Sequence, residues 1–255
     1  MKKLIDAKIV ESVRLNGNYG LLKVTPADGQ PLPECLPGQF VEIKIDGAGI
    51  LLRRPISINN VEPEKNLLWL LVRNAGRGTE HLISLPAGSV VNILLPLGNG
   101  FTMPEKPGST VMLVGGGVGV APLLYLGKKL SEAGHHPLFV LGVRSAADIL
   151  EKEEFEKVGD VYHSTEDGSY GEKGFVTQHS AMGRSVDRMY VCGPAPMMKA
   201  VARIARERDI PTEVSLENMM ACGLGACLCC VEKTVRGNVC VCTEGPVFPL
   251  TALTW

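Results

Sequence analysis

The 255-residue sequence has almost no net charge and few aromatic residues. It contains 26 lysines and arginines against 27 aspartates and glutamates, a formal net charge of −1, and only 5% of its residues are aromatic. Without a basic excess, no long-range electrostatic field draws the protein to nucleic acid or to an anionic membrane. We therefore expect neither of them as a binding partner.

We also expect neither a secretory leader nor a membrane span. The first ten residues open with a basic pair, but Asp6 and Lys8 interrupt any apolar core. One uncharged stretch, residues 107–127, has transmembrane length, yet its six glycines and two prolines suit an apolar strand, a glycine turn and the start of a helix. The sequence thus predicts a cytoplasmic protein.

The five histidines have neither metal-ligand nor catalytic spacing, so the sequence offers no candidate catalytic residue. Cysteine is abundant instead. Seven of the eight cysteines lie between Cys192 and Cys242, and six of them fall within the 21 residues that begin at Cys222. In a reducing cytoplasm, clustered cysteines bind metal more often than they form disulfides.

The length suits two modest domains and a small third one, which we place at residues 1–104, 105–216 and 217–255. In the first domain, short apolar runs separated by turn clusters predict a small antiparallel β-barrel or sandwich. The clearest of these strands are Phe40–Ile45, Leu67–Val72 and Val90–Leu95.

In the second domain, apolar strands alternate with helical segments, which is typical of a doubly wound α/β fold with a parallel sheet. The predicted strands are Thr110–Val114, Pro137–Leu141 and Met189–Val191, and the predicted helices are Pro122–Glu132, Ala146–Lys157 and Ala195–Glu207. The third domain is too small for an apolar core of its own, so we expect a metal centre to hold it together.

The stretch ACGLGACLCC carries the most specific signal. Cys222, Cys227 and Cys230 have the C-x4-C-x2-C spacing of three thiolate ligands of a plant-type [2Fe-2S] cluster, whose fourth ligand lies downstream. Gly223 and Gly225 suit a loop that turns backbone amides toward sulfur.

Spacing alone leaves the ligand set open. Cys229 adjoins Cys230, and Cys240 precedes Cys242 by two residues, so either neighbour could replace a ligand. A zinc site and a set of inert buried cysteines are the alternatives to an iron-sulfur cluster.

A second signal is VMLVGGGVGVAP, in which an apolar strand runs into a glycine turn and a helix. Bare backbone amides at the N-terminus of such a helix can hold a pyrophosphate. The glycines concerned are Gly115, Gly116, Gly117 and Gly119.

This loop is not the Rossmann fingerprint, because the next strand is followed by Arg144 and not closed by an acidic residue. A later strand ends in Cys192, Gly193 and Pro194, which places a second backbone loop at the same edge of the sheet. The two loops together favour a nucleotide site over a simple tight turn.

A third signal lies in the first domain, in LLRRPISI and LVRNAGRGTEHL. Arg54 is a candidate phosphate ligand, and Ser57 is a candidate hydrogen-bond partner of a heteroaromatic ring. Gly76, Gly78 and Thr79 precede a short helix whose amides can bind another phosphate. Each feature alone is a weak signal, because an arginine beside a proline is usually a solvated edge residue and Gly-x-Gly-Thr is usually a turn and a helix cap.

In this order, the three signals resemble the ferredoxin-NADP reductase superfamily, in which a β-barrel binds flavin through an R-x-Y/F-S motif and an α/β domain binds the nicotinamide nucleotide. Ile56 replaces the usual aromatic residue of that motif. The Arg-Pro-Ile-Ser version, with ACGLGACLCCV and CTEGPVF, is similar from end to end to the electron transfer subunits of NAD-dependent (class 1B) dihydroorotate dehydrogenases.

The resemblance implies FAD and a [2Fe-2S] cluster as cofactors and NAD as cosubstrate. It assigns cluster ligation to Cys222, Cys227, Cys230 and Cys242. It assigns FAD contacts to Arg54, Pro55, Ile56, Ser57, Leu71, Val72, Arg73, Gly78 and Thr79, and nucleotide contacts to Gly115, Gly116, Gly117, Gly119, Cys192, Gly193 and Pro194.

The resemblance also implies a partner, an FMN-containing catalytic subunit that oxidises dihydroorotate in pyrimidine (UMP) biosynthesis, in a heterotetramer with two copies of each chain. Flavin is needed because nicotinamide accepts two electrons at once, whereas an iron-sulfur cluster passes them singly. Glu166 and Asp167 follow a short strand and disfavour a 2′-phosphate, which favours NAD over NADP.

Two alternative functions stay open. One is a subunit of another flavin and iron-sulfur reductase, such as an NADH-dependent ferredoxin:NADP oxidoreductase or a sulfide dehydrogenase. The other is a non-enzymatic, zinc-bound interaction module on a reductase-like scaffold. Met219, Met220 and Leu224 either contact the partner or shield the cluster from water.

Overall fold

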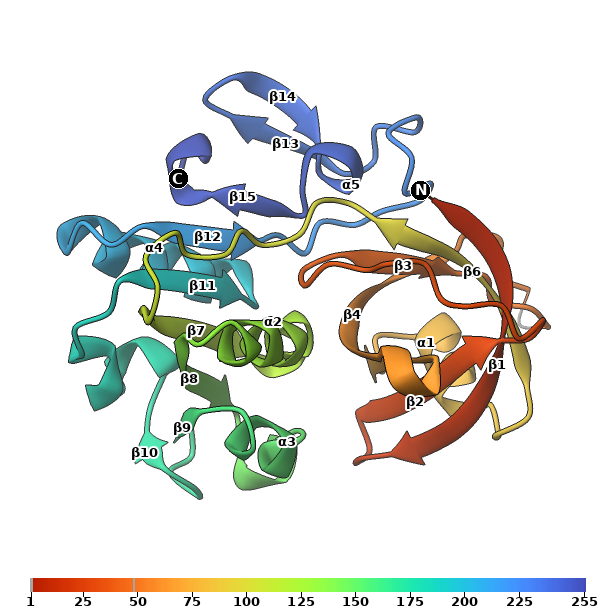
Figure 1. Cartoon of the computed structure of the whole chain (residues 1–255), viewed down its shortest axis with the longest axis horizontal. Coiled ribbons are helices and arrows are strands. Elements are labelled where there is room, and N and C mark those ends of the chain that lie inside the picture. Colours follow the sequence, from red (N-terminus) through yellow and green to blue (C-terminus); the bar gives the residue numbers. More distant parts are fainter. Residues whose placement is uncertain (1, 48) are drawn as a thin grey trace.

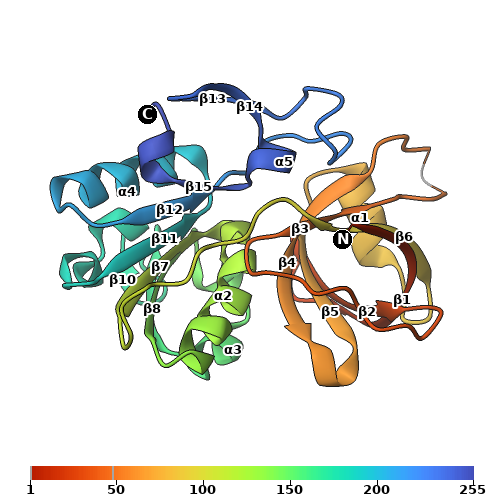
Figure 2. The same cartoon turned by 45° about the horizontal axis from the view of Figure 1, so that its top comes forward.

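The structure, a computed structural model, describes residues 2–47 and 49–255, which form a β-barrel, a sheet flanked by helices and a small C-terminal region (Figure 1). The barrel and the sheet lie side by side, and the C-terminal region lies across one end of both (Figure 2). The predicted fold class, an antiparallel barrel followed by a mainly parallel α/β domain and a small third region, is confirmed.

Six antiparallel strands close the barrel in the order β1-β2-β5-β4-β3-β6. Their bounds are β1 Lys3–Arg14, β2 Tyr19–Pro26, β3 Phe40–Ile43, β4 Arg54–Glu62, β5 Leu67–Arg73 and β6 Val90–Leu97, and helix α1 (Arg77–Ser84) follows β5. Because side chains alternate along a strand, Val41 and Ile43 lie in the barrel core, whereas Phe40 packs outside it against the rest of the molecule.

The α/β domain contains a seven-stranded sheet in the order β10-β9-β8-β7-β11-β12-β15. The strands are β7 Thr110–Gly116, β8 His136–Val143, β9 Asp160–Thr165, β10 Glu172–Lys173, β11 Arg188–Cys192, β12 Thr212–Ser215 and β15 Val247–Pro249, and the helices are α2 Ala121–Glu132, α3 Lys152–Glu156 and α4 Ala195–Glu207. Strand β7 is apolar on both faces because Leu113 packs on the side of α2 and Val114 on the side of α4.

Helix α2 joins the α/β domain to the barrel. The ring of Tyr125 lies within the barrel core, and its hydroxyl donates a hydrogen bond to the carbonyl of Cys35 at 3.1 Å. The Cys35 thiol donates to the carbonyl of Pro33 at 3.3 Å, and burial raises its pKa to about 12. Cys35, which had no predicted role, therefore belongs to the packing between the two domains.

The predicted helix over Ala146–Lys157 is wrong in its first half. The structure has a short 3-10 helix at Ala146–Asp148, and α3 begins only at Lys152. The break falls at Glu151, whose φ of 50° is left-handed and whose carboxylate accepts a hydrogen bond from Asn59 of β4 at 2.9 Å. A contact with the barrel thus overrides the local helical pattern.

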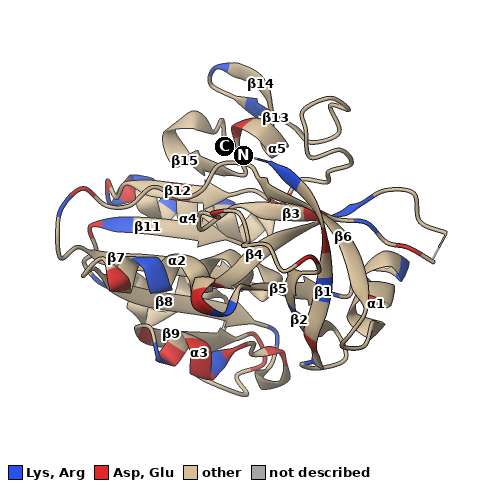
Figure 3. Ribbon diagram, turned by 45° about the vertical axis from the view of Figure 1, so that its right-hand side comes forward, with Lys and Arg blue, Asp and Glu red and all other residues tan. Residues whose placement is uncertain are grey.

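Residues 107–127 contain strand β7, a 3-10 turn and the first half of α2, which confirms the predicted strand, glycine turn and helix start. Within the described residues, no helix is both long and apolar enough to cross a membrane. Along the ribbon of the barrel and the α/β domain, lysine and arginine residues are interspersed with aspartate and glutamate residues (Figure 3).

The C-terminal region contains a hairpin, β13 (Val231–Thr234) and β14 (Gly237–Cys240), and a one-turn helix α5 (Val241–Glu244). It packs on both larger domains. Its last strand, β15, pairs antiparallel with β12 of the α/β sheet. On the barrel side, the amide of Asn99 donates to the carbonyl of Glu244 at 2.9 Å.

Candidate functional site

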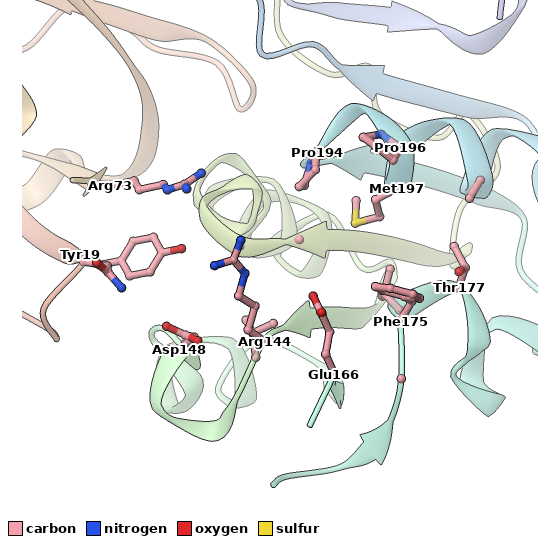
Figure 4. Close-up of a pocket in the computed structure, with 18 of the residues that line it drawn as sticks. Tyr19, Arg73, Arg144, Asp148, Glu166, Phe175, Thr177, Pro194, Pro196 and Met197 are labelled. Atoms are coloured by element: carbon pink, nitrogen blue, oxygen red, sulfur yellow. The ribbon is translucent and has the colours of Figure 1, made fainter. Parts of the chain in front are cut away.

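A cavity of about 540 Å³ opens between the barrel and the α/β domain (Figure 4). The α/β domain contributes the carboxyl ends of β7 and β8 and the start of α4, and open α/β sheets bind ligands at this edge. The barrel contributes the turn before β2 and the end of β5. The cavity is therefore the candidate nucleotide site.

The structure brings the two predicted nucleotide loops together at this cavity. Gly115 of β7 and Cys192 of β11 are register partners on neighbouring parallel strands. Beyond them, Gly116, Gly117 and Pro194 line the cavity itself. The two loops therefore present backbone next to each other, as a pyrophosphate site requires.

Gly119 allows these loops to approach closely. A Cβ atom at this position would lie 2.4 Å from the carbonyl oxygen of Cys192 and 2.5 Å from the Cα of Gly193. Because both atoms belong to backbone, we expect Gly119→Ala to destabilise the protein by about 3 kcal/mol and to weaken nucleotide binding. Thermal unfolding measures the loss. Gly183→Ala is the control, since a Cβ there meets nothing within 4 Å; equal melting temperatures for the two variants would contradict the prediction.

Charged side chains from both domains reach this cavity. Arg73 comes from the end of β5 and Arg144 from the segment after β8, and Asp148 and Glu166 supply carboxylates (Figure 4). Burial raises the pKa of Tyr19 on the barrel side, with the Arg73 guanidinium opposing the shift. The two guanidinium groups suit the phosphates of a dinucleotide, and the carboxylates suit its hydroxyl groups.

Tyr19 and Asp148 were not among the predicted site residues. A residue after a turn and a carboxylate in a loop carry no motif, and only the packing of the barrel on the α/β domain brings them to the cavity. Cys192 lies behind the cavity, where it is buried, and its Sγ lies 3.9 Å from the carboxylate of Glu217. Burial raises the pKa of both groups.

On the barrel, the structure brings together two of the predicted flavin features. The guanidinium of Arg54 lies against Gly78 in the first turn of α1, where a Cβ atom would come within 2.9 Å of its Nε. Its Nη1 donates to the carbonyl of Leu52 at 2.8 Å and to that of Arg53 at 3.1 Å. Arg54 is thus fixed at a helix N-terminus, where a phosphate is favoured.

The other predicted flavin residues lie on β4, β5 and α1, and their exposure to solvent ranges from buried to exposed. Ile56 is buried in the barrel core, whereas Ser57, the next residue along β4, is half-buried. On β5, Leu71 is buried against the α/β domain and Arg73 is exposed at the cavity. The remaining members of the predicted set are Pro55, which is half-buried, Val72, which is buried in the barrel core, and Thr79, which is buried in α1. The feature that fits FAD best is the guanidinium of Arg54, because it lies beside Gly78 at the start of α1, where a phosphate can bind.

The four predicted cluster ligands come from the loop before β13 and from α5. Among the described residues, no three His, Cys, Asp or Glu side chains are grouped as they would be around a single metal ion. Backbone amides nevertheless donate to three of the four sulfurs, which is the environment that thiolate ligands of iron need. The donors are Leu224 to Cys222 at 3.4 Å, Cys242 to Cys230 at 3.4 Å and Gly225 to Cys242 at 3.2 Å.

Hydrogen bonding distinguishes Cys240 from the predicted ligand Cys242, whereas the pKa values do not follow the predicted ligand set. Burial acts to raise the pKa of Cys222, but hydrogen bonds, the strongest from the amide of Leu224, lower it to about 6, whereas burial raises the pKa of Cys242 to about 12. Cys240 differs, because its thiol donates to the carbonyl of Gly225 at 3.8 Å. A carbonyl oxygen repels a thiolate, so Cys240 suits a protonated thiol, whereas Cys242 receives an amide and suits a ligand. The donor set therefore fits a cluster.

Glu42 of β3 is a third residue that no sequence motif indicates. It is fully buried, and neither carboxylate oxygen has a hydrogen-bond partner among the described residues. Burial raises its pKa to about 7, opposed by Arg53 and Arg54. A Cβ atom at Gly223, where φ is +65°, would come within 2.9 Å of its Cγ. The cluster loop therefore packs directly on the barrel strand next to β4.

The fold and these sites define a class of protein, the reductases of the ferredoxin reductase type. Residues 113–203 match the family described as an oxidoreductase NAD-binding domain. A chain from the structure of the NADH-dependent reduced ferredoxin-NADP oxidoreductase, solved in work on flavin-based electron bifurcation, superposes with a TM-score of 0.87 at 31% identity, covering 98% of this chain and 90% of that one. The ferredoxin reductase of carbazole 1,9a-dioxygenase (TM-score 0.71, 20% identity, 82% of this chain and 67% of that one) shares the fold.

The C-terminal region defines the family more narrowly. Residues 217–254 match the iron-sulfur cluster binding domain of dihydroorotate dehydrogenase B. The dihydroorotate dehydrogenase B (NAD(+)) electron transfer subunit of Shouchella clausii is 45% identical over 84% of this chain and 85% of its own length, and that of Lysinibacillus sphaericus is 42% identical over 87% and 88%. The chain belongs to the family of dihydroorotate dehydrogenase B electron transfer subunits, and the resemblance seen in the sequence is confirmed.

Proposed function

We propose that this chain carries electrons from a dihydroorotate-oxidising partner to NAD, through a [2Fe-2S] cluster and FAD held on its own residues. One observation supports the proposal above the others. The cluster loop packs directly on β3, the strand that pairs with the start of β4, where the flavin motif lies. Gly223 packs on Glu42, and Glu42 is the register partner of Pro55.

In this proposal, FAD and the cluster are held by separate sets of residues. FAD, when bound, exchanges hydride with nicotinamide and single electrons with an iron-sulfur cluster. Arg54 and the amides at the start of α1 hold its phosphates, and Ser57 offers a hydroxyl to its ring system. Cys222, Cys227, Cys230 and Cys242 supply the thiolates of the cluster. No side chain of this subunit needs to act as an acid, a base or a nucleophile.

On the nucleotide side, the amides of Gly116 and Gly117 and the guanidinium of Arg144 hold the phosphates of NAD. Glu166 lines the cavity with a carboxylate that repels a 2′-phosphate, so NAD is preferred over NADP. The carboxylate of Asp167 is engaged within its own turn, because it accepts hydrogen bonds from the amide and the hydroxyl of Ser169 at 2.9 and 2.6 Å. Glu166 is therefore the acidic residue that sets this preference.

The partner that we propose is an FMN-containing TIM-barrel subunit, in a cytoplasmic heterotetramer with two copies of each chain that serves pyrimidine biosynthesis. Exposed apolar side chains lie in and just before the cluster loop, namely Met219 (82% exposed), Leu224 (51%) and Leu228 (64%). Apolar side chains with this exposure are typical of a surface that a partner covers. Met220, by contrast, packs on the apolar core beneath the loop.

Co-expression with such a partner tests the function. We expect the purified complex to be flavin-coloured with the reddish absorbance of a [2Fe-2S] cluster, and to reduce NAD when dihydroorotate is added. NADP is expected to be a poorer acceptor. A complex that reduces NAD with reduced ferredoxin or sulfide but not with dihydroorotate would contradict the substrate, and a colourless zinc protein would contradict the redox function altogether.

A further inference from the structure

The segment between β8 and α3, residues 144–151, joins the nucleotide cavity to the barrel, and we call it the cleft segment. Arg144 and Asp148 at its beginning and middle line the cavity. Glu151 at its end lies at the barrel, where the predicted helix is broken. The same short segment therefore carries two cavity side chains and a contact with the other domain.

Two hydrogen bonds tie the cleft segment to the barrel. The amide of Asn16, in the turn between β1 and β2, donates to the carbonyl of Ala147 at 2.9 Å. The amide of Asn59 on β4 donates to Oε2 of Glu151 at 2.9 Å and to the carbonyl of Ala121, the first residue of α2, at 3.2 Å. Asn59 thus bridges the barrel to two elements of the α/β domain at once.

The backbone is irregular at both residues of the contact between Asn59 and Glu151. The register between β4 and β5 shifts between Ile58 and Asn60, and an irregularity of this kind redirects the side chain within it. Glu151 has the left-handed φ of 50°, which costs a non-glycine residue energy that the surrounding contacts must offset. Two local distortions thus converge on one hydrogen bond.

This contact is also buried. Asn59 is fully buried, and each of the two side chains keeps one oxygen, Oδ1 and Oε1, that has no hydrogen-bond partner among the described residues. Burial raises the pKa of Glu151 to about 7, with Asn59 opposing the shift and with Glu154 of α3, Lys128 of α2 and Lys23 of β2 as the charged neighbours. A buried polar pair of this kind adds little stability but strongly specifies geometry.

We propose that Asn59 and Glu151 are positioning residues that hold the cleft segment against the barrel, and thereby hold Arg144 and Asp148 in place for the nucleotide. The proposal rests on the proposed function in assigning NAD to the cavity. When the contact is lost, the segment spends part of its time undocked, and the apparent affinity for the nucleotide falls by the docked fraction. Steps after binding depend on the flavin and proceed unchanged.

The experiment uses the full chain loaded with FAD and its cluster. We expect Asn59→Ala to raise the KM for NADH in dye reduction by about tenfold, the factor that corresponds to one lost hydrogen bond to a carboxylate, and to leave kcat within about twofold. Glu151→Gln keeps an acceptor for Asn59 and should retain a KM close to wild type. Glu153→Gln, an exposed carboxylate two residues further on, is the control for the change of charge.

Hydrogen-deuterium exchange without nucleotide gives a second readout, independent of NADH oxidation. Asn59→Ala should raise exchange over residues 144–151 and leave the central strand β7 protected. Glu151→Gly should also raise exchange over residues 144–151, because it removes the carboxylate that accepts a hydrogen bond from Asn59. This variant should still fold, because glycine adopts the left-handed backbone conformation freely. Unchanged exchange in both variants would overturn the proposal, as would increased exchange with an unchanged KM. A wild-type protein that does not oxidise NADH would instead contradict the proposed function, while the exchange data would still test the contact.

Discussion

Cys230→Ser is expected to give folded protein that has lost its iron-sulfur cluster. Cys230 is 2% exposed, and its sulfur accepts a hydrogen bond from the amide of Cys242 at 3.4 Å, so serine would place a harder oxygen ligand in a site built for thiolate. Iron and sulfide per chain should fall by roughly tenfold, and the visible absorbance and the electron paramagnetic resonance signal of the reduced cluster should fall with them.

The matched control is the adjacent Cys229→Ser. Cys229 is exposed, and we expect its variant to keep the cluster. A second pair tests the downstream ligand: Cys242→Ser should lose the cluster and Cys240→Ser should keep it, because the sulfur of Cys242 receives the amide of Gly225 and that of Cys240 faces a carbonyl. If Cys240→Ser bleaches the protein and Cys242→Ser does not, the assigned ligand set is wrong.

Features of the site that depend on neighbouring residues could be predicted from the sequence, and those that depend on domain packing could not. The spacing of Cys222, Cys227 and Cys230 is a local property, and so is the strand-turn-helix pattern around Gly117. Glu42 contacts the cluster loop, and Tyr19 lines the cavity with residues of the α/β domain, only because the barrel packs on these parts of the chain. No sequence pattern predicts this packing. Their roles therefore came from the structure.

The wrong prediction of a continuous helix over Ala146–Lys157 also results from domain packing. The residues from Ala146 to Lys157 are compatible with a continuous helix, and in isolation the pattern favours one. In the folded protein, Glu151 is held in a left-handed conformation by Asn59, which lies 92 residues earlier in the sequence. The helix prediction failed where a long-range contact stabilises a distortion, and that contact is also one of those that join the barrel to the α/β domain.

Arg54→Ala is expected to give protein that loses FAD during purification. The guanidinium is the cation placed beside the start of α1, and its Nη1 is already held by the carbonyls of Leu52 and Arg53. Removing a charge-assisted contact to a phosphate should weaken FAD binding by about 2 kcal/mol, or roughly 30-fold. The ratio of flavin to protein absorbance measures the loss, and added FAD should restore it. Arg14→Ala is the control, because Arg14 pairs with Glu80 of the same helix at an exposed site.

A double-mutant cycle tests whether Gly78 and Arg54 act on FAD binding through one contact. A methyl group at Gly78 would come within 2.9 Å of Nε and 3.1 Å of Nη2 of Arg54, so Gly78→Ala should displace the guanidinium and weaken FAD binding in the wild-type background. In the Arg54→Ala background the guanidinium is absent, and the same change should cost little more. Two residues that act through one contact give non-additive effects of this kind. Additive losses of FAD affinity would show that Gly78 acts independently of Arg54, and an unchanged affinity in Arg54→Ala would exclude this arginine as a phosphate ligand.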